Sequence, residues 1–272
     1  RPGTIRVVIG EPIEPIPVTK QMPFWKSVVL QKEQLRQRIN RQLPHRYHRD
    51  FFDQGVRHDI AAFFDIDHTL SLHKTLKGLF LWMLGHHLLS TKQFLEMEGA
   101  LIKQLSGRQT HEEMMAELAM AMKGVSTQAL SSYANEFFHE VGRSWLNLDL
   151  YSYVIDHKQC EHRMIIVSET IQPLAECYRA FVQAQDVYGT ILGEKDGKLT
   201  GGVERLMRGE EKKRVVEQYA KIHHICLEDS FAYADDETDI PLLTSVGHPI
   251  IVAPHQKRLL NFVSKRHWEV IE

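Results

Sequence analysis

Short apolar runs, separated by longer stretches with helical periodicity, dominate the chain from residue 59 onward. The runs cover Ile60 to Phe64, Met164 to Val167, Phe231 to Ala234 and Pro249 to Val252. Continuous apolar runs of this length that alternate with helical patterns are typical of parallel strands buried on both faces of a sheet. The pattern therefore predicts an α/β fold with a doubly wound, mainly parallel sheet.

About a hundred residues between the first two runs are helix-like and offer no strand candidate. This stretch is too long for a connection inside a compact sheet, so it predicts an inserted α-helical cap domain. We place the cap at residues 73–157 and the sheet core at residues 56–72 and 158–272. In the core we also expect a helix over 172–184, a hairpin that turns at 195–198, and a helix over 210–221.

Residues 1–55 form a separate N-terminal segment and linker in this interpretation. Thr4 to Pro17 predicts a short strand and a proline-punctuated connector, and Trp25 to Leu43 predicts an amphipathic helix. The chain begins at Arg1 without an initiator methionine or a signal sequence, so we expect it to be a fragment of a longer protein.

Composition narrows the class of protein. The 272 residues, 43% of them hydrophobic, suffice for one large domain with an insert, and the net charge of -2 provides no field that would recruit nucleic acid. Three scattered cysteines without CxxC spacing indicate neither a disulfide framework nor a zinc site, which favours a cytoplasmic location. The most apolar stretch, residues 76–89, is too short and too polar to be a transmembrane segment.

Three of the predicted strands are each followed by a polar residue that can carry chemistry. These residues are Asp65, Ser168 and Asp235. Because ligands of open α/β sheets bind outside the carboxyl ends of the strands, we expect the three side chains to converge on one crevice.

The same region is rich in carboxylates. Asp65 and Asp67 are two residues apart, and Asp235 and Asp239 add further carboxylates from another strand end. Carboxylates this close repel one another unless a cation neutralises them. Oxygen ligands without a nearby cysteine favour magnesium, so the sequence predicts a Mg2+ site.

A carboxylate that attacks a phosphate ester needs cations and hydrogen-bond donors around the phosphoryl oxygens. Lys212 is the candidate cation, with Lys213 as the alternative, and the hydroxyls of Ser168 and Thr69 are candidate donors. Ser168 could equally cap a helix and Lys212 could be a surface lysine. Their assignment depends on the motifs occurring together.

With Asp65 as the nucleophile, a second group must protonate the leaving alkoxide and then activate water. Asp67 is placed for both steps. Together these residues predict a phosphatase.

The order of these motifs resembles the haloacid dehalogenase superfamily, and more narrowly its phosphoserine-phosphatase-like branch with a small helical cap. The matching positions are Asp65-x-Asp67-x-Thr69, Ser168, Lys212 and Asp235-Asp236-x-x-Asp239. The resemblance implies a Rossmann-like core, a nucleophile and metal ligand in Asp65, and an acid/base in Asp67 that also binds the metal through its backbone carbonyl. It further implies phosphate binding by Ser168 and Lys212, direct metal binding by Asp235, and support of the metal site by Asp239.

Three positions depart from the family pattern or vary within it. Glu169 and Thr170 stand where phosphoserine phosphatases usually carry small residues, which argues against phosphoserine as the substrate. Asp236 replaces a frequent Gly or Ser, and its role is open. The role of His68, whose position varies among relatives, is open as well.

Residues 1–45 resemble the C-terminal end of lysophosphatidate-type acyltransferases, through the segment Arg1 to Ile13 and the predicted helix after it. His45 and Asp50 have the His-x4-Asp spacing of acyltransferase catalysis. They lie downstream of the Pro-Gly-Thr segment, however, where that family has its motif upstream, so we interpret them as coincidental. The resemblance implies a covalent acyltransferase neighbour in a longer chain and a place in the cytoplasm or at the membrane periphery.

The sequence as a whole predicts a magnesium-dependent phosphomonoester hydrolase that forms a phospho-aspartate on Asp65. Its substrate would be a small phosphate ester, with a glycerolipid-related compound suggested by the N-terminal resemblance. The alternative is a non-catalytic domain that binds a phosphorylated ligand and regulates an attached acyltransferase.

Overall fold

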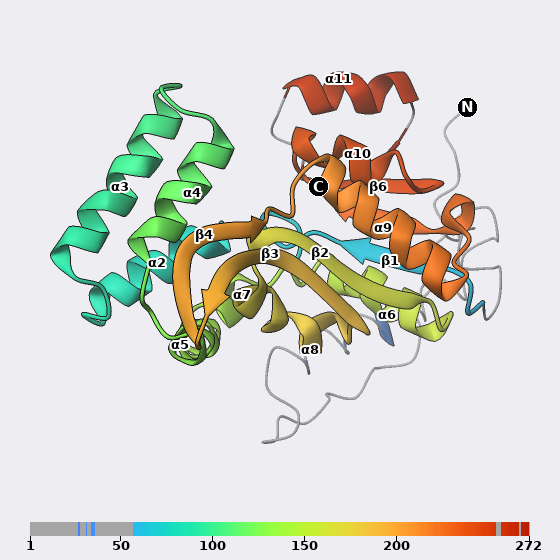
Figure 1. Cartoon of the computed structure of the whole chain (residues 1–272). Coiled ribbons are helices and arrows are strands. Elements are labelled where there is room, and N and C mark those ends of the chain that lie inside the picture. Colours follow the sequence, from blue (N-terminus) through green and yellow to red (C-terminus); the bar gives the residue numbers. More distant parts are fainter. Residues whose placement is uncertain are drawn as a thin grey trace, which may run out of the picture.

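A computed structural model describes residues 57–253, 257–266 and 268–271, together with residues 27, 31, 34 and 35. Within this part of the chain the strands are β1 (Ala61–Phe64), β2 (Arg163–Ile171), β3 (Asp186–Lys195), β4 (Lys198–Arg205), β5 (Phe231–Ala234), β6 (His248–Val252) and β7 (Glu269–Ile271). They form one sheet in the order β4-β3-β2-β1-β5-β6-β7 (Figure 1). Every neighbouring pair is parallel except the hairpin β3–β4. The prediction of a mainly parallel α/β sheet is confirmed.

Helices cover both faces of this sheet. One face carries α6 (Tyr151–Gln159), α7 (Gln172–Glu176) and α8 (Arg179–Val182), and the other carries α9 (Glu210–His223), α10 (Ile240–Leu243) and α11 (Lys257–Arg266). Successive side chains of a strand point to opposite faces, so each face receives alternate residues of β1. Ala62 and Phe64 pack toward α6, whereas Ala61 and Phe63 pack toward α9.

A group of helices inserted after β1 has its own apolar core. It consists of α2 (Thr75–Gly85), α3 (Thr91–Leu105), α4 (His111–Ala121), α5 (Thr127–Glu140) and the short 3-10 helix η3 (Gly142–Trp145). Buried side chains such as Leu79, Met115 and Phe137 pack together here with Leu199 from the β3–β4 hairpin. The hairpin therefore extends the sheet toward the cap.

The packing of α6 bears on the predicted end of the cap at residue 157. Tyr151, Tyr153 and Val154 of α6 pack in the same cluster as β1 and β2. We therefore propose that the cap ends before α6 and that α6 belongs to the sheet core.

Some elements differ from their predicted form. The single helix expected over 172–184 is wrong: α7 and α8 are separated at Cys177 and Tyr178. The amides of these two residues bond to carbonyls three residues back, which tightens the backbone into a turn. Tyr178 is thereby buried against Phe138.

Two strand features also differ from expectation. β2 runs beyond Val167 to Ile171, with a register shift in between, so Ser168 lies inside the strand rather than after it. The short edge strand β7 was not predicted, because its sequence contains no apolar run. The strand, helix and linker expected in residues 1–55 lie outside the described residues, apart from four positions.

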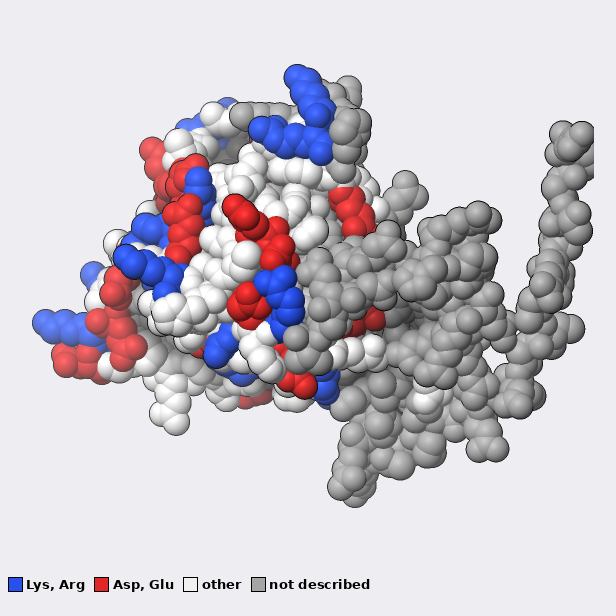
Figure 2. All heavy atoms as spheres, turned by 90° about the vertical axis from the view of Figure 1, so that its right-hand side faces the viewer, with Lys and Arg blue, Asp and Glu red and all other residues white. Residues whose placement is uncertain are grey.

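Two surface properties bear on the expected partners. No helix in the described part of the chain combines the length and the apolar character needed to cross a membrane. On the face shown in Figure 2, basic and acidic side chains are interspersed among the atoms that are described. This distribution agrees with the small net charge of the whole sequence.

Candidate active site

The two strands at the centre of the sheet bring the acidic residues together. Asp65 directly follows β1 and Asp235 directly follows β5, and these strands are parallel neighbours. The Asp65 amide donates to the Tyr233 carbonyl over 3.0 Å, which continues the strand pairing up to the site. Both carboxylates therefore meet at the carboxyl edge of the sheet, as the sequence predicts.

A third carboxylate completes this cluster. Asp239 lies on the 3-10 helix η5 (Glu237–Asp239), and carboxylate oxygens of Asp65, Asp235 and Asp239 all lie within 4.8 Å of one another. Asp236 caps η5 by accepting a hydrogen bond from the Thr238 amide over 2.8 Å. This hydrogen bond holds the turn that carries Asp239.

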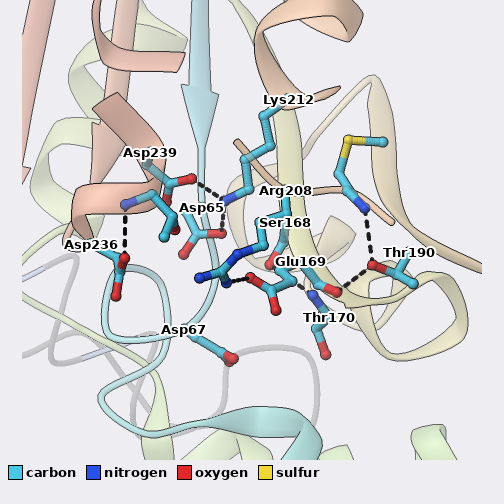
Figure 3. A network of polar contacts seen from close by, with 12 residues as sticks. Asp65, Asp67, Ser168, Glu169, Thr170, Thr190, Arg208, Lys212, Asp236 and Asp239 are labelled. Atoms are coloured by element: carbon cyan, nitrogen blue, oxygen red, sulfur yellow. Dashed lines mark hydrogen bonds and ion pairs between the residues drawn. The ribbon is translucent and has the colours of Figure 1, made fainter. Parts of the chain in front are cut away.

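Lys212 enters this acidic cluster from the first turn of α9. Gly209 begins the helix with a φ of +54°, a left-handed conformation that glycine adopts without strain. The Lys212 Nζ lies 2.8 Å from Asp65 Oδ1 and 2.7 Å from Asp239 Oδ1 (Figure 3). Lys213, the alternative, points to Glu217 instead, so Lys212 is the lysine in the site.

The acidic residues of this cluster outnumber the cations. Burial would lower the pKa of Lys212, but the charges of Asp239 and Asp65 outweigh burial and raise it, so this lysine stays charged. Burial, followed by the charges of Asp65, Asp239 and Asp236, raises the pKa of Asp235 to about 9, and burial likewise raises the pKa of Asp239. One lysine does not neutralise three carboxylates. The donor set is all oxygen, which fits a hard divalent cation such as magnesium.

Both candidate phosphate-binding hydroxyls are buried. Thr69 is fully buried, and its Oγ1 has no hydrogen-bond partner among the described residues. Ser168 is also buried, at the register shift of β2, and its Oγ accepts a hydrogen bond of 3.4 Å from the Thr170 amide. A buried hydroxyl without a partner is costly, and a bound oxyanion would supply an acceptor for Thr69.

Asp67 is not part of the three-carboxylate cluster. Its Oδ1 accepts hydrogen bonds from the Thr75 amide over 2.8 Å and from the Thr75 hydroxyl over 2.6 Å. Burial and then the charge of Asp65 raise the pKa of Asp67 to about 6, despite these hydrogen bonds. A carboxyl group with this pKa can give up and take back a proton near neutral pH.

Glu169, the residue after Ser168, connects the core to the cap. One of its carboxylate oxygens contacts His111, the first residue of the cap helix α4. The other contacts Arg208, which lies just before α9 (Figure 3). Burial raises the pKa of Glu169, but the hydrogen bond and charge of His111, together with the charge of Arg208, lower it overall. Glu169 is therefore a carboxylate held between two basic groups.

His68, whose role was open, shapes the turn between Asp67 and Thr69. It has a φ of +56°, and its Nδ1 lies 3.2 Å from the Leu72 carbonyl oxygen. These observations give it a local role in the loop.

Sequence reasoning did not single out Thr75, His111 or Arg208. Each acts through a contact with a residue that the motifs contain or adjoin, and the partners are far apart in sequence or on another domain. His111 is 58 residues from Glu169, and nothing in the local pattern around either residue signals the contact.

Residues 62–244 match the family of haloacid dehalogenase-like hydrolases. A probable phosphatase of Mycobacterium tuberculosis is 26% identical over 214 residues, which cover 78% of this chain and 74% of that protein. The chain therefore belongs to the haloacid dehalogenase-like hydrolases, and both the predicted family and the predicted enzyme class are confirmed.

Solved structures share the fold. A protein of unknown function from Bordetella pertussis superposes with a TM-score of 0.69 at 24% identity, over 79% of this chain and 99% of that one. A phospho-aspartyl intermediate analogue of phosphoserine phosphatase gives a TM-score of 0.55 at 19% identity, over 79% and 93% of the two chains. The resemblance of residues 1–45 to acyltransferases stays a prediction, since these residues lie outside the family match.

Proposed function

We propose that this haloacid dehalogenase-like phosphatase hydrolyses phosphomonoesters with magnesium, through a phospho-aspartate on Asp65. The observation that carries the proposal is the position of Lys212 between Asp65 and Asp239, with Asp235 in the same buried cluster. A nucleophilic carboxylate, a fixed cation and further oxygen ligands are the parts that phosphoryl transfer to a carboxylate requires.

The carboxylates of Asp65 and Asp235 and the backbone carbonyl of Asp67 would hold the magnesium ion, with Asp239 in support. When bound, the ion supplies positive charge that offsets the repulsion between the phosphate dianion and the Asp65 carboxylate. The raised pKa of Asp235 supports this assignment, because it marks negative charge that the chain does not balance by itself.

The chain's own residues carry the two chemical steps. A carboxylate oxygen of Asp65 attacks phosphorus and the bond from phosphorus to the ester oxygen breaks, while Asp67 gives its proton to the leaving oxygen. Lys212, Ser168 and Thr69 bind the phosphoryl oxygens. Asp67 then takes a proton from water as the water oxygen attacks the aspartyl phosphate, which releases inorganic phosphate and restores Asp65.

We propose a small phosphate ester as the substrate, enclosed by the cap so that bulk water is excluded. Phosphoserine phosphatases are among the structural relatives, but both oxygens of Glu169 are engaged by His111 and Arg208 beside Ser168. The Glu169 contacts argue against a site specialised for phosphoserine. Phosphoserine, glycerol phosphate and lysophosphatidate are therefore to be compared directly as substrates. A glycerolipid-related ester fits the predicted acyltransferase neighbour.

The test is the hydrolysis of an aryl phosphate with magnesium by the wild-type chain and by Asp65→Asn. We expect turnover by the wild type and a loss of about 10⁴-fold or more in the variant, because the nucleophile is removed. Turnover by Asp65→Asn at the wild-type rate would overturn the mechanism. Tight binding of magnesium and phosphate by a wild-type chain that turns over no ester in the panel would instead favour the non-catalytic regulatory domain.

A further inference from the structure

The first residue of the first cap helix holds the carboxylate of Asp67. Thr75 opens helix α2, and both its amide and its hydroxyl donate to Asp67 Oδ1. Lys74, at the N-cap position of α2, makes no side-chain capping hydrogen bond. Asp67 therefore supplies the acceptor that a capping side chain normally gives to the first turn of a helix, although it lies outside the helix.

This contact is buried on the Thr75 side and partly buried at Asp67. Thr75 is fully buried, and the hydrogen bond from its hydroxyl to Asp67 is short, at 2.6 Å. A short hydrogen bond to a partly buried carboxyl group meets less competition from solvent than an exposed one, which favours a single orientation of the group. Both donors reach the same oxygen, and the structure gives Oδ2 of Asp67 no hydrogen bond to a described residue.

Thr170 extends this contact into the core. Its Oγ1 lies 3.2 Å from Thr75 Oγ1, and Thr170 is itself buried in strand β2. A hydroxyl has one hydrogen to donate, and Thr75 gives its hydrogen to Asp67. Thr170 is therefore the donor in this pair, and the three side chains form a directed chain from the core strand through the cap helix to Asp67.

We propose that Thr75 is a positioning residue that fixes Oδ1 of Asp67, so that Oδ2 carries the proton exchanged with the substrate. The inference depends on the proposed function, in which Asp67 is the acid and base. In the first step the breaking bond from phosphorus to the ester oxygen leaves its electron pair on that oxygen, which takes the proton from Oδ2. In the second step Oδ2 accepts a proton from the attacking water.

The arrangement also couples the cap to the chemistry. Thr75 moves with α2, which is the first helix of the cap, whereas Asp67 belongs to the loop after β1. A displacement of α2 would remove both donors from Oδ1 together. The proton donor is therefore correctly oriented only when the cap is in the position seen here.

The test compares an alkyl phosphate, such as glycerol phosphate, with an aryl phosphate that carries a good leaving group. The value of kcat/KM includes only steps up to the departure of the alcohol, and an acidic phenol needs little help from a proton donor. For Thr75→Val, which keeps the amide but loses the hydroxyl, we expect kcat/KM to fall about 10-fold or more for the alkyl ester. We expect a fall of no more than about 2-fold for the aryl ester, and near wild-type values for both esters in Thr75→Ser.

A matched control is Thr91→Val, the same change at the first position of the cap helix α3, where the side chain is exposed. This variant should have the wild-type kcat/KM for both esters. An equal loss for the two esters in Thr75→Val, or no loss for either, overturns the inference while the proposed function stands. A wild-type chain that hydrolyses neither ester is a failure of the proposed function itself.

Discussion

The two sides of the active site are built on different principles. On the metal side, three carboxylates from core elements share one lysine, and all of these groups are at least partly buried. On the cap side, each carboxylate already has partners within the chain. Asp67 is held by Thr75, and Glu169 is held by His111 and Arg208.

The difference separates what a bound cation must do from what the cap must do. On the metal side one lysine does not balance three carboxylates, so Asp235 keeps a proton in the folded chain, and a bound cation would relieve the cost of gathering these groups. The cap side is satisfied by contacts across the boundary between two domains, so it depends on where the cap lies. Removing a carboxylate charge should therefore stabilise the metal side and destabilise the cap side.

The largest effect should follow from removing the single cation of the metal side. Lys212→Met keeps the length of the side chain but leaves Asp65 and Asp239 without their buried partner. Loss of one member of a buried ionic group typically costs about 3–5 kcal/mol. Urea unfolding without magnesium should show a loss of this size, whereas Lys213→Met, on the neighbouring partly exposed lysine, should unfold like the wild type. Equal stability of the two variants would show that Lys212 is not needed to balance the carboxylates.

Removing a carboxylate from the metal side should have the opposite sign. The pKa of Asp235 is raised to about 9, so at pH 7 the folded chain retains a proton that the unfolded chain releases near pH 4. The raised pKa thus lowers stability at pH 7. Asp235→Asn should stabilise the metal-free chain by roughly 2 kcal/mol and abolish the increase in Tm that we expect magnesium to give to the wild type.

A control for this change is Asp196→Asn in the hairpin turn, where the side chain is exposed and an asparagine tolerates the positive φ. It should alter neither the metal-free stability nor the response to magnesium. A loss of stability in Asp235→Asn would contradict the view that the metal side stores unfavourable charge.

The metal side is also the part of the site that can be predicted from the sequence. Asp65 and Asp235 directly follow apolar runs, and the rule that parallel strands end at one edge of a sheet is enough to bring them together. Lys212 was left open against Lys213, because the rotation of a helix relative to its neighbours depends on contacts that local pattern does not contain. Gly209 and the apolar face of α9 set that rotation.

The cap side could not be predicted in this way. Glu169 attracted notice only as a departure from a family pattern, and its partner His111 belongs to another domain. Contacts of this kind depend on how two domains with separate apolar cores lie against each other. The tight turn at Cys177 was missed for a similar reason, because burial of the adjacent Tyr178 overrides the helical propensity of that stretch.

The cap side is tested by Glu169→Gln, which keeps the shape of the side chain and removes its charge. Both contacts weaken, and we expect a loss of about 1–2 kcal/mol in stability together with faster amide hydrogen exchange in α4. The matched change Glu112→Gln alters the exposed residue next to His111 and should have neither effect. Unchanged exchange in α4 of Glu169→Gln would mean that this contact does not tie the cap to the core.

A third buried polar cluster lies outside the site and consists of two histidines. It can be compared with the carboxylates of the two sides. His157 and His162 share a contact of 2.9 Å between their Nδ1 atoms, and His157 Nε2 lies 2.7 Å from the Tyr233 hydroxyl. Burial lowers the pKa of His162 to about 4 and holds the pKa of His157 well below its usual value. Both side chains are therefore neutral in the folded chain at pH 7.

Acid should destabilise the chain through this pair. Unfolded histidines take up protons near pH 6.5, and the folded pair takes them up only at lower pH, so this stability is present above pH 6.5 and is lost as the pH falls toward 4. Between pH 7 and pH 5.5 each histidine should cost about 1 kcal/mol in urea unfolding. His162→Gln should reduce this loss by about half, whereas the change His139→Gln at an exposed position should leave it intact. If His162→Gln loses as much stability as the wild type, the acid sensitivity arises elsewhere, and the carboxylates of the two sides become the groups to examine.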